Sequence, residues 1–233
     1  MYPAIVILGL FFAGKYFPQT DKYAVSRNNM VTTQLAARGI SDKLVLEAFR
    51  KVPRHLFVPP EYEKDAYGDF PLPIGHGQTI SQPYVVAYMT ESVKPSGSKR
   101  ALEIGTGSGY QAAILSELTD TVYTIEIVPE LARESATRLR ILGYGNVVCR
   151  AGDGYAGWPG HAPFDIIIVT AAAESIPEPL VSQLAENGRM IIPVGYRNGV
   201  QQLKLVVKKK GKVHITDLLP VRFVPFTRKP SGN

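Results

Sequence analysis

Between residues 101 and 192 the sequence alternates short apolar runs with longer segments of helical character. The apolar runs have the length and composition of strands and cover residues 101–104, 122–125, 147–149, 165–169 and 189–192. The helical segments cover residues 111–118, 129–142 and 177–184, and the last two open with a proline, which the first turn of a helix tolerates. Strands and helices that alternate at this spacing form a parallel sheet. We therefore predict a doubly wound α/β fold, with a mostly parallel sheet and helices on both of its faces.

Two helices are expected before this core. The apolar residues after Ser41 recur with helical spacing, so we predict a helix that has Ser41 as its N-cap and is stopped by Pro53. An earlier helix is predicted over residues 28–38, ending at Gly39. Residues 53–83 are rich in proline and glycine, so we expect a long ordered loop without regular elements. Loops of that length in compact domains are usually functional.

The segment after the core predicts C-terminal strands, of which we expect the first two to pair as a hairpin. These strands cover residues 203–207, 213–219 and 221–226. The lysines at 208–210 flank Gly211, a pattern typical of a solvated hairpin turn rather than of a phosphate site. We predict that residues 27–233 form a single domain and that residues 1–26 are an extension to it.

The apolar stretch from Ala4 to Gly14 leaves the role of this extension open. It is shorter than the roughly 20 residues that span a bilayer, and no basic residue precedes it, so we expect no stable membrane insertion. A secretory signal cleaved near Ala13, a true start at Met30, and a peripheral strand or helix all fit it. The single cysteine, Cys149, excludes an internal disulfide and fits a reducing compartment. We expect a cytoplasmic monomer, with export as the alternative if the first 14 residues are a signal.

A glycine-rich loop follows the first strand of the core. It spans residues 103–110 and reads Glu-Ile-Gly-Thr-Gly-Ser-Gly-Tyr, so a ligand can approach its backbone closely. A dinucleotide fingerprint requires glycine three positions after Gly107, where this chain has Tyr110. This difference favours a ligand without a diphosphate.

Three acidic residues stand at the carboxyl ends of successive predicted strands, where an open α/β sheet binds its ligands. Glu126 is placed to accept hydrogen bonds from the two ribose hydroxyls of an adenosine cofactor, and Asp153 to bond the adenine amino group. Glu103 is a natural partner for a cationic group of that cofactor. Each of the three could instead be a helix cap or turn residue, but the combination with the glycine loop favours a ligand site.

Several motifs resemble bacterial protein-L-isoaspartate O-methyltransferases, over about residues 27–228. The segment Gln78-Thr79-Ile80-Ser81-Gln82-Pro83 is specific to that family, whereas the glycine loop is shared by many methyltransferases. The other similar segments are residues 52–59, 71–77, 103–109, 164–165, 171–173 and 193–195. The resemblance implies a class I, Rossmann-like fold and S-adenosyl-L-methionine as cofactor, with S-adenosyl-L-homocysteine as product.

The resemblance also implies roles for individual residues. Ser81 matches the serine assigned as the active-site residue of the family, and a histidine that contacts the cofactor in animal members is replaced here by Val86. The expected substrate-binding residues are Thr79, Ile80, Val221, Val224 and Pro225. The expected cofactor-binding residues are Gln78, Thr79, Glu103, Gly105, Gly107, Ser108, Glu126, Ile127, Gly152, Asp153, Gly154 and Thr227.

The implied activity is methylation of the free carboxylate of L-isoaspartyl residues in damaged proteins and peptides, which initiates repair; D-aspartyl residues are left open as a second substrate. Such a carboxylate has a pKa near 4, so at pH 7 it is already a nucleophile and needs no general base. Holding it within about 3 to 3.5 Å of the methyl supplies much of the acceleration. We expect Ser81 to orient the carboxylate, although it could also cap the helix that follows. The four histidines are widely separated, so no metal is expected.

Two other functional classes are compatible with parts of this sequence. The net charge of +6 would suit a nucleic-acid methyltransferase, but residues 170–173 read Thr-Ala-Ala-Ala and lack the Asn/Asp-Pro-Pro-aromatic box of base-amino methylases. We therefore expect no nucleic-acid partner. A non-catalytic module that binds adenosine compounds or protein ends is the second alternative, and in such a module Ser81 would be dispensable.

Overall fold

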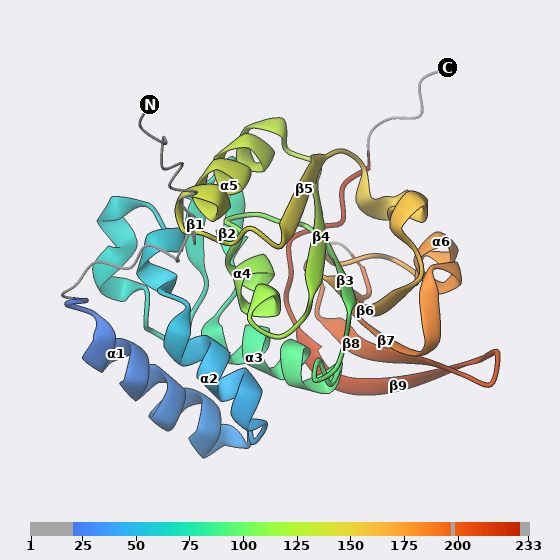
Figure 1. Cartoon of the computed structure of the whole chain (residues 1–233), viewed down its shortest axis with the longest axis horizontal. Coiled ribbons are helices and arrows are strands. Elements are labelled where there is room, and N and C mark those ends of the chain that lie inside the picture. Colours follow the sequence, from blue (N-terminus) through green and yellow to red (C-terminus); the bar gives the residue numbers. More distant parts are fainter. Residues whose placement is uncertain (1–20, 197–198, 229–233) are drawn as a thin grey trace, which may run out of the picture.

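The computed structural model describes residues 21–196 and 199–228, and within them a seven-stranded sheet has the order β5-β4-β3-β6-β7-β8-β9 (Figure 1). Its first five strands in this order are parallel, and β8 and β9 complete one edge as antiparallel strands. The strands are β3 (Arg100–Ile104), β4 (Thr121–Glu126), β5 (Val147–Ala151), β6 (Phe164–Val169), β7 (Leu184–Val194), β8 (Gln201–Lys209) and β9 (Lys212–Val221). The predicted mostly parallel α/β sheet is confirmed.

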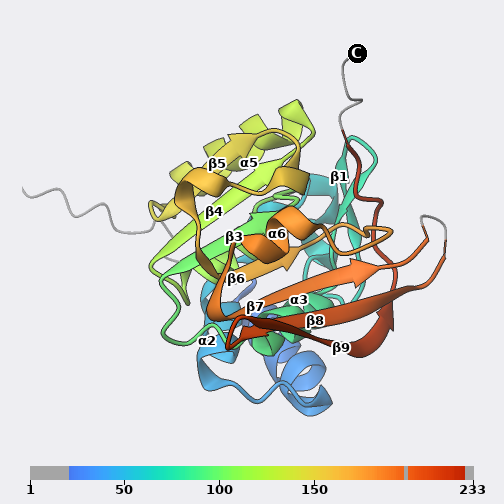
Figure 2. The same cartoon turned by 90° about the vertical axis from the view of Figure 1, so that its right-hand side faces the viewer.

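Helices cover both faces of the sheet, as predicted, because successive residues of each central strand are buried on opposite sides. Ala101 and Ile166 pack in one core cluster with residues of α2 to α5, while Leu102 and Ile167 pack in a second cluster with α6. Figure 2 shows α6 on the opposite side of the sheet from α2 and α3. The helices are α1 (Ala24–Asn29), α2 (Lys43–Lys51), α3 (Pro83–Ser92), α4 (Tyr110–Ser116), α5 (Pro129–Ile141) and α6 (Glu178–Ser182).

The N-terminal helical region differs in detail from the prediction. Helical structure starts at Ala24, four residues earlier than expected, and ends as predicted at Gly39, whose φ is +97°. The predicted N-cap Ser41 is wrong, because Asp42 caps α2 by accepting hydrogen bonds from the N–H groups of Leu44 and Val45 at 2.9 and 3.2 Å. A carboxylate at this position also complements the positive end of the helix dipole.

The prediction that residues 53–83 lack regular elements is also wrong. This segment forms 3₁₀ turns at Arg54–Phe57 and Pro60–Asp65, followed by a small antiparallel hairpin of β1 (Leu72–Gly75) and β2 (Gln78–Ile80). The prolines are compatible with it because 3₁₀ turns accept proline near their start and each strand of a two-stranded hairpin has a free edge. Ser81 therefore directly follows the hairpin and lies between β2 and α3.

The C-terminal strands confirm one expectation and correct another. β8 and β9 form the predicted hairpin, turning at Lys210 and Gly211 with φ values of +51° and +70°. The predicted strand over residues 221–226 is wrong: after Val221 the chain leaves the sheet. The predicted helix 177–184 likewise ends at Ser182, and Leu184 already belongs to β7. In the part of the chain that the structure describes, no helix is long and apolar enough to span a membrane.

Residues 222–228, here called the C-terminal strap, cross the carboxyl edge of the sheet. The strap is held at Ala172, just beyond β6: the Ala172 N–H donates to the Val224 carbonyl, and the Phe226 N–H donates to the Ala172 carbonyl, both at 2.8 Å. Since the predicted ligand crevice lies along this same edge, the strap becomes part of it.

Candidate functional site

The site lies at the carboxyl ends of β3 and β6, which are neighbours in the sheet. The chain continues from β3 towards one edge of the sheet and from β6 towards the other, and ligands of such folds usually bind at this point. The Gly105 N–H donates to the Ile125 carbonyl at 2.8 Å, and the Thr170 N–H donates to the Ile104 carbonyl at 2.9 Å. A Cβ at Gly105 would lie 2.4 Å from the Thr170 hydroxyl oxygen, and Gly105 has a φ of +94°. Glycine is therefore required here, both for its conformation and for the close approach of Thr170.

Glu126 braces the glycine loop from the end of β4. One carboxylate oxygen accepts a hydrogen bond from the Gly107 N–H at 2.8 Å, and the other accepts one from the Val128 N–H at 2.9 Å. The residue is only 5% exposed, yet it lines a cavity at the carboxyl edge of the sheet. The carboxylate thus shapes the loop and retains lone pairs for hydroxyl groups of a ligand.

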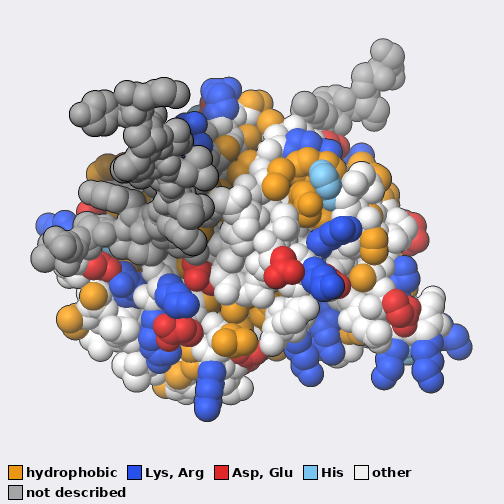
Figure 3. Space-filling model, viewed as in Figure 1, with side chains coloured by type: hydrophobic (Ala, Val, Ile, Leu, Met, Phe, Trp, Pro, Cys, Tyr) orange, Lys and Arg blue, Asp and Glu red, His pale blue; other side chains and the backbone are white. Residues whose placement is uncertain are grey.

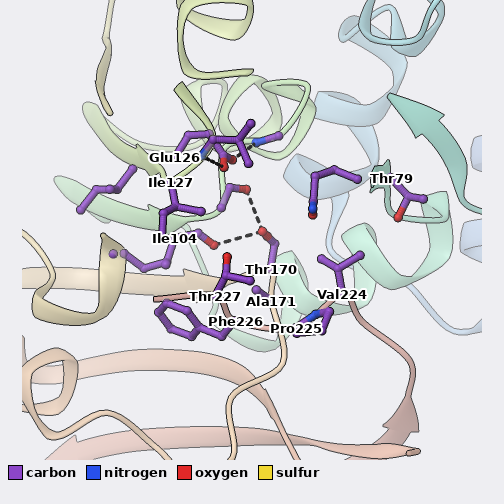
Figure 4. A pocket seen from close by; sticks show the side chains of 16 residues that line it. Thr79, Ile104, Glu126, Ile127, Thr170, Ala171, Val224, Pro225, Phe226 and Thr227 are labelled. Atoms are coloured by element: carbon purple, nitrogen blue, oxygen red, sulfur yellow. Dashed lines mark hydrogen bonds between the residues drawn. The ribbon is translucent and has the colours of Figure 1, made fainter. Parts of the chain in front are cut away.

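This cavity, which we call the cofactor cavity, lies between the glycine loop, the end of β4 and the C-terminal strap. Figure 4 shows Glu126 and Ile127 across the cavity from Thr79, with Thr170 between them. The Thr170 hydroxyl donates to the carbonyls of Ile104 and Gly105 at 3.0 and 2.7 Å. The lining residues are Gln78, Thr79, Ile104, Gly105, Gly107, Ile125, Glu126, Ile127, Val128, Gly154, Thr170, Ala171, Val224, Pro225, Phe226 and Thr227.

Glu103 lies behind the glycine loop and is fully buried. The Thr124 hydroxyl donates to one of its carboxyl oxygens at 2.5 Å, and the other oxygen has no hydrogen-bond partner. Burial, with a smaller contribution from the nearby charge of Glu126, raises the pKa of this carboxyl to about 8, although the Thr124 hydrogen bond acts in the opposite direction. Glu103 borders a second, smaller cavity, here called the inner cavity, together with Ile80, Ser81, Val86 and Ser108.

A third cavity, the substrate groove, lies on the other side of Thr79. Ser81, Val221 and Val224 line it, and its charged lining residues are Arg38 and Arg222. Thr79 and Thr170 line the cofactor cavity, the inner cavity and the groove alike. The three spaces therefore meet at this pair of threonines, and Ser81 borders two of them.

The structure brings most of the predicted site residues to these cavities, with four departures. One is Ile80, which was predicted to bind substrate but lines the inner cavity and not the groove. Gly152 and Asp153 do not line the cofactor cavity, and the Asp153 carboxylate accepts hydrogen bonds from the Tyr155 N–H and from Arg228. Pro225, predicted to bind substrate, lines the cofactor cavity rather than the groove. The strap determines the surroundings of Asp153 and Pro225, because it crosses the sheet edge instead of continuing as a strand.

Thr170, Ala171 and Phe226 line the cofactor cavity without having been predicted as site residues. A signal for Thr170 was present, since a polar residue directly after a buried strand lies at the ligand edge of a parallel sheet. No local pattern marks Phe226, whose position depends on the path of the strap.

The lining fits the predicted adenosyl sulfonium cofactor on chemical grounds. An unpaired oxygen of a buried carboxyl group, Glu103, suits a cationic group. Glu126 suits a ribose, and the apolar side chains of Ile104, Ile127 and Phe226 suit a purine face. The cofactor cavity and the inner cavity together thus offer a counterpart to each part of that molecule.

Comparisons with known proteins agree with this fit. Residues 26–231 match the family described as protein-L-isoaspartate(D-aspartate) O-methyltransferase (PCMT). The chain is 58% identical over 203 residues to the protein-L-isoaspartate O-methyltransferase of Opitutus terrae, covering 87% of each chain. It is 56% identical over 200 residues to that of Gloeobacter violaceus, covering 86% of this chain and 98% of the relative.

Two solved structures are similar over most of the chain. One, a protein-L-isoaspartate O-methyltransferase, has a TM-score of 0.77 and 32% identity over 85% of this chain and 65% of its own. The other, a Plasmodium falciparum beta-aspartate methyltransferase in complex with S-adenosyl-L-homocysteine, has a TM-score of 0.73 and 28% identity over 87% of this chain and 99% of its own.

Proposed function

The chain belongs to the protein-L-isoaspartate(D-aspartate) O-methyltransferase family, and from this premise we propose how it transfers a methyl group to damaged proteins. The enzyme methylates the free carboxylate of L-isoaspartyl residues with S-adenosyl-L-methionine and so initiates their repair. The observation that carries this proposal for the site is that Thr79 and Thr170 border both the cofactor cavity and the substrate groove. A carboxylate in the groove would meet the cofactor at this junction.

The bound cofactor supplies an electrophilic methyl group on a sulfonium. We propose that Glu126, Ile127, Gly154 and Thr227 hold its adenosine part and that Glu103, Gly105, Gly107 and Ser108 surround its amino acid part. Gln78 and Thr79 would border it from the side of the hairpin. Burial under the C-terminal strap excludes water, which strengthens these electrostatic contacts.

Ser81 acts in this proposal by orientation. Its hydroxyl can donate to the substrate carboxylate, which at pH 7 is already ionised, so no residue has to remove a proton. Thr79 and Ile80 lie beside it, while Val221 and Val224 line the groove along which the substrate backbone would pass. Arg222, which is exposed, makes this groove positive, whereas the charge of Arg38 is paired with Asp69. A positive groove favours a substrate that carries carboxylates.

Methyl transfer to a matched pair of peptides tests the proposal. Tritium from methyl-labelled S-adenosylmethionine should appear on an isoaspartyl peptide but not on its aspartyl twin, since the extra backbone methylene repositions the carboxylate. Ser81→Ala should lower kcat on the isoaspartyl peptide, whereas Ser182→Ala, at an exposed position on α6, should leave it unchanged. Equal labelling of both peptides would contradict the specificity, and full activity of Ser81→Ala would support the non-catalytic role of that residue.

We also propose that residues 27–233 act as one methyltransferase domain, working as a cytoplasmic monomer without a nucleic-acid partner. On the face shown in Figure 3, Lys and Arg side chains are spread over several elements and are interspersed with Asp and Glu, unlike the basic stripe that nucleic acids require. The free thiol of Cys149 fits a reducing compartment. The apolar stretch from Ala4 to Gly14, on which the export alternative depends, lies outside the described residues.

A further inference from the structure

Arg54 is a buried cation whose hydrogen bonds go to main-chain carbonyls. Its side chain is fully buried, with the Nε–H donating to the Ala66 carbonyl at 2.7 Å and Nη2 donating to the Ser81 carbonyl at 2.8 Å. Its guanidinium carbon also lies 4.9 Å from the ring centre of Tyr110, the first residue of α4 after the glycine loop. Arg54 therefore connects the serine segment with the start of the cofactor-loop helix.

Keeping the charged guanidinium of Arg54 buried costs free energy. Burial lowers the pKa of Arg54 to about 10, so the side chain remains protonated at pH 7 while losing its contact with water. A packed apolar side chain often stabilises a fold as well as or better than a buried ionic group does. An arginine here needs an explanation other than the filling of the core.

Ser81 has few other constraints on its backbone. It follows β2, which pairs with β1 in a separate two-stranded sheet, and it precedes Gln82 and the helix that begins with Pro83. The long range of the Arg54 contact, 27 residues along the chain, ties this connection to the protein interior. The Arg54 bond thus fixes the main chain at the point where the Ser81 hydroxyl must face the junction of the cavities.

We propose that Arg54 is a positioning residue for methyl transfer, which acts by holding the Ser81 carbonyl so that the Ser81 hydroxyl is aimed at the substrate carboxylate. This inference rests on the proposed role of Ser81. A positioning role differs from a purely structural role because Arg54 should then influence catalysis only through Ser81.

A double-mutant cycle separates these two roles. Arg54→Lys keeps the charge but loses the planar fork that reaches two carbonyls at once. We expect it to lower kcat on the isoaspartyl peptide by about 10- to 100-fold, since a misplacement of about 1 Å can cost that much. Its KM and its Kd for S-adenosylhomocysteine should stay within about threefold. With Ser81→Ala already present, Arg54→Lys should lower kcat no further, because coupled residues are not additive.

Arg27→Lys provides the matched control, because Arg27 also donates from Nε to a main-chain carbonyl, that of Arg50, but has no contact with Ser81. It should leave kcat unchanged. Arg54→Gln, which is uncharged, serves as the second variant if the lysine variant does not fold, as judged by circular dichroism and Tm. Additive losses in the double mutant, unchanged kcat in a folded Arg54 variant, or a parallel loss of cofactor affinity would overturn the inference. If Ser81→Ala itself keeps full kcat, the proposed role of Ser81 fails first, and the cycle identifies which of the two proposals is wrong.

Discussion

The carboxylate of Asp153 and the guanidinium of Arg228 form an ion pair, with 2.8 Å between Oδ2 and Nε, that joins the end of β5 to the C-terminal strap. The guanidinium also stacks on the Tyr155 ring, 3.6 Å from its centre. Because Val224 to Thr227 of the strap line the cofactor cavity, this pair closes the strap over that cavity. Asp153, predicted to bond the adenine amino group, therefore already has a charged partner in the strap.

Substituting each partner of this ion pair separates the predicted adenine contact of Asp153 from its role in holding the strap. Arg228→Met removes a partly exposed ion pair worth at most about 1 kcal/mol, so we expect at most a fivefold loss of affinity for S-adenosylhomocysteine. Asp153→Ala should weaken binding about tenfold or more, because it also removes the predicted adenine contact. Isothermal titration calorimetry measures both; equal losses would mean that Asp153 only fastens the strap.

Glu126→Ala is expected to weaken binding of S-adenosylmethionine by about 1 to 3 kcal/mol, because the carboxylate is the predicted partner of the ribose hydroxyls. Part of the effect comes from the Gly107 N–H, which loses its acceptor and leaves the loop less ordered. Glu130→Ala, at an exposed position in the first turn of α5, is the control and should bind normally. Unchanged calorimetric affinity in Glu126→Ala would contradict the ribose role.

Thr170→Val tests the threonine that all three cavities share. Valine keeps the shape but removes the single hydroxyl proton that the Ile104 and Gly105 carbonyls share, a hydrogen bond worth about 0.5 to 1.5 kcal/mol. We expect a loss of at least threefold in cofactor affinity, together with a lower Tm, whereas Thr170→Ser should retain both values. A valine variant that binds like the serine variant would show that this hydrogen bond does not organise the loop.

Glu103 should make the cofactor-free protein less stable as the pH rises. An acid whose folded-state pKa, about 8, lies above its ordinary value of 4.5 keeps its proton in the folded state at a pH where the unfolded chain has released it. The free energy of unfolding should therefore fall between about pH 4.5 and 8 and then level off. Glu103→Gln should remove this decline and be more stable at pH 8, by a difference on the order of 1 to 4 kcal/mol. Urea denaturation at pH 5, 6.5 and 8 measures it, and parallel curves for the two proteins would contradict the burial of a neutral acid.

The local pattern of apolar residues was sufficient to predict three strands of the central sheet, whereas β7 begins at Leu184, before the predicted run 189–192. The runs that predicted β3, β4 and β6 correspond to observed strands within a residue at each end, because apolar strands buried on both faces have a strong signature. The sequence pattern was less successful where residues typical of loops occur within strands. Residues 53–83 carry proline and glycine typical of a loop, yet β1 and β2 form there because a hairpin tolerates both residues at its edges and turn.

The sequence by itself determined the parallel sheet, the glycine loop at its ligand edge, the acids at the ends of β3 and β4, and the serine motif. Each of these depends on neighbouring residues or on a short repeat, which the linear order contains. Only the tertiary structure decided that the strap crosses the sheet edge. It also decided that Arg228 donates a hydrogen bond to Asp153, 75 residues away, and that Arg54 donates one to the Ser81 carbonyl. Such contacts arise from the path of the whole chain, because the free energy of bringing distant segments together depends on all the packing between them.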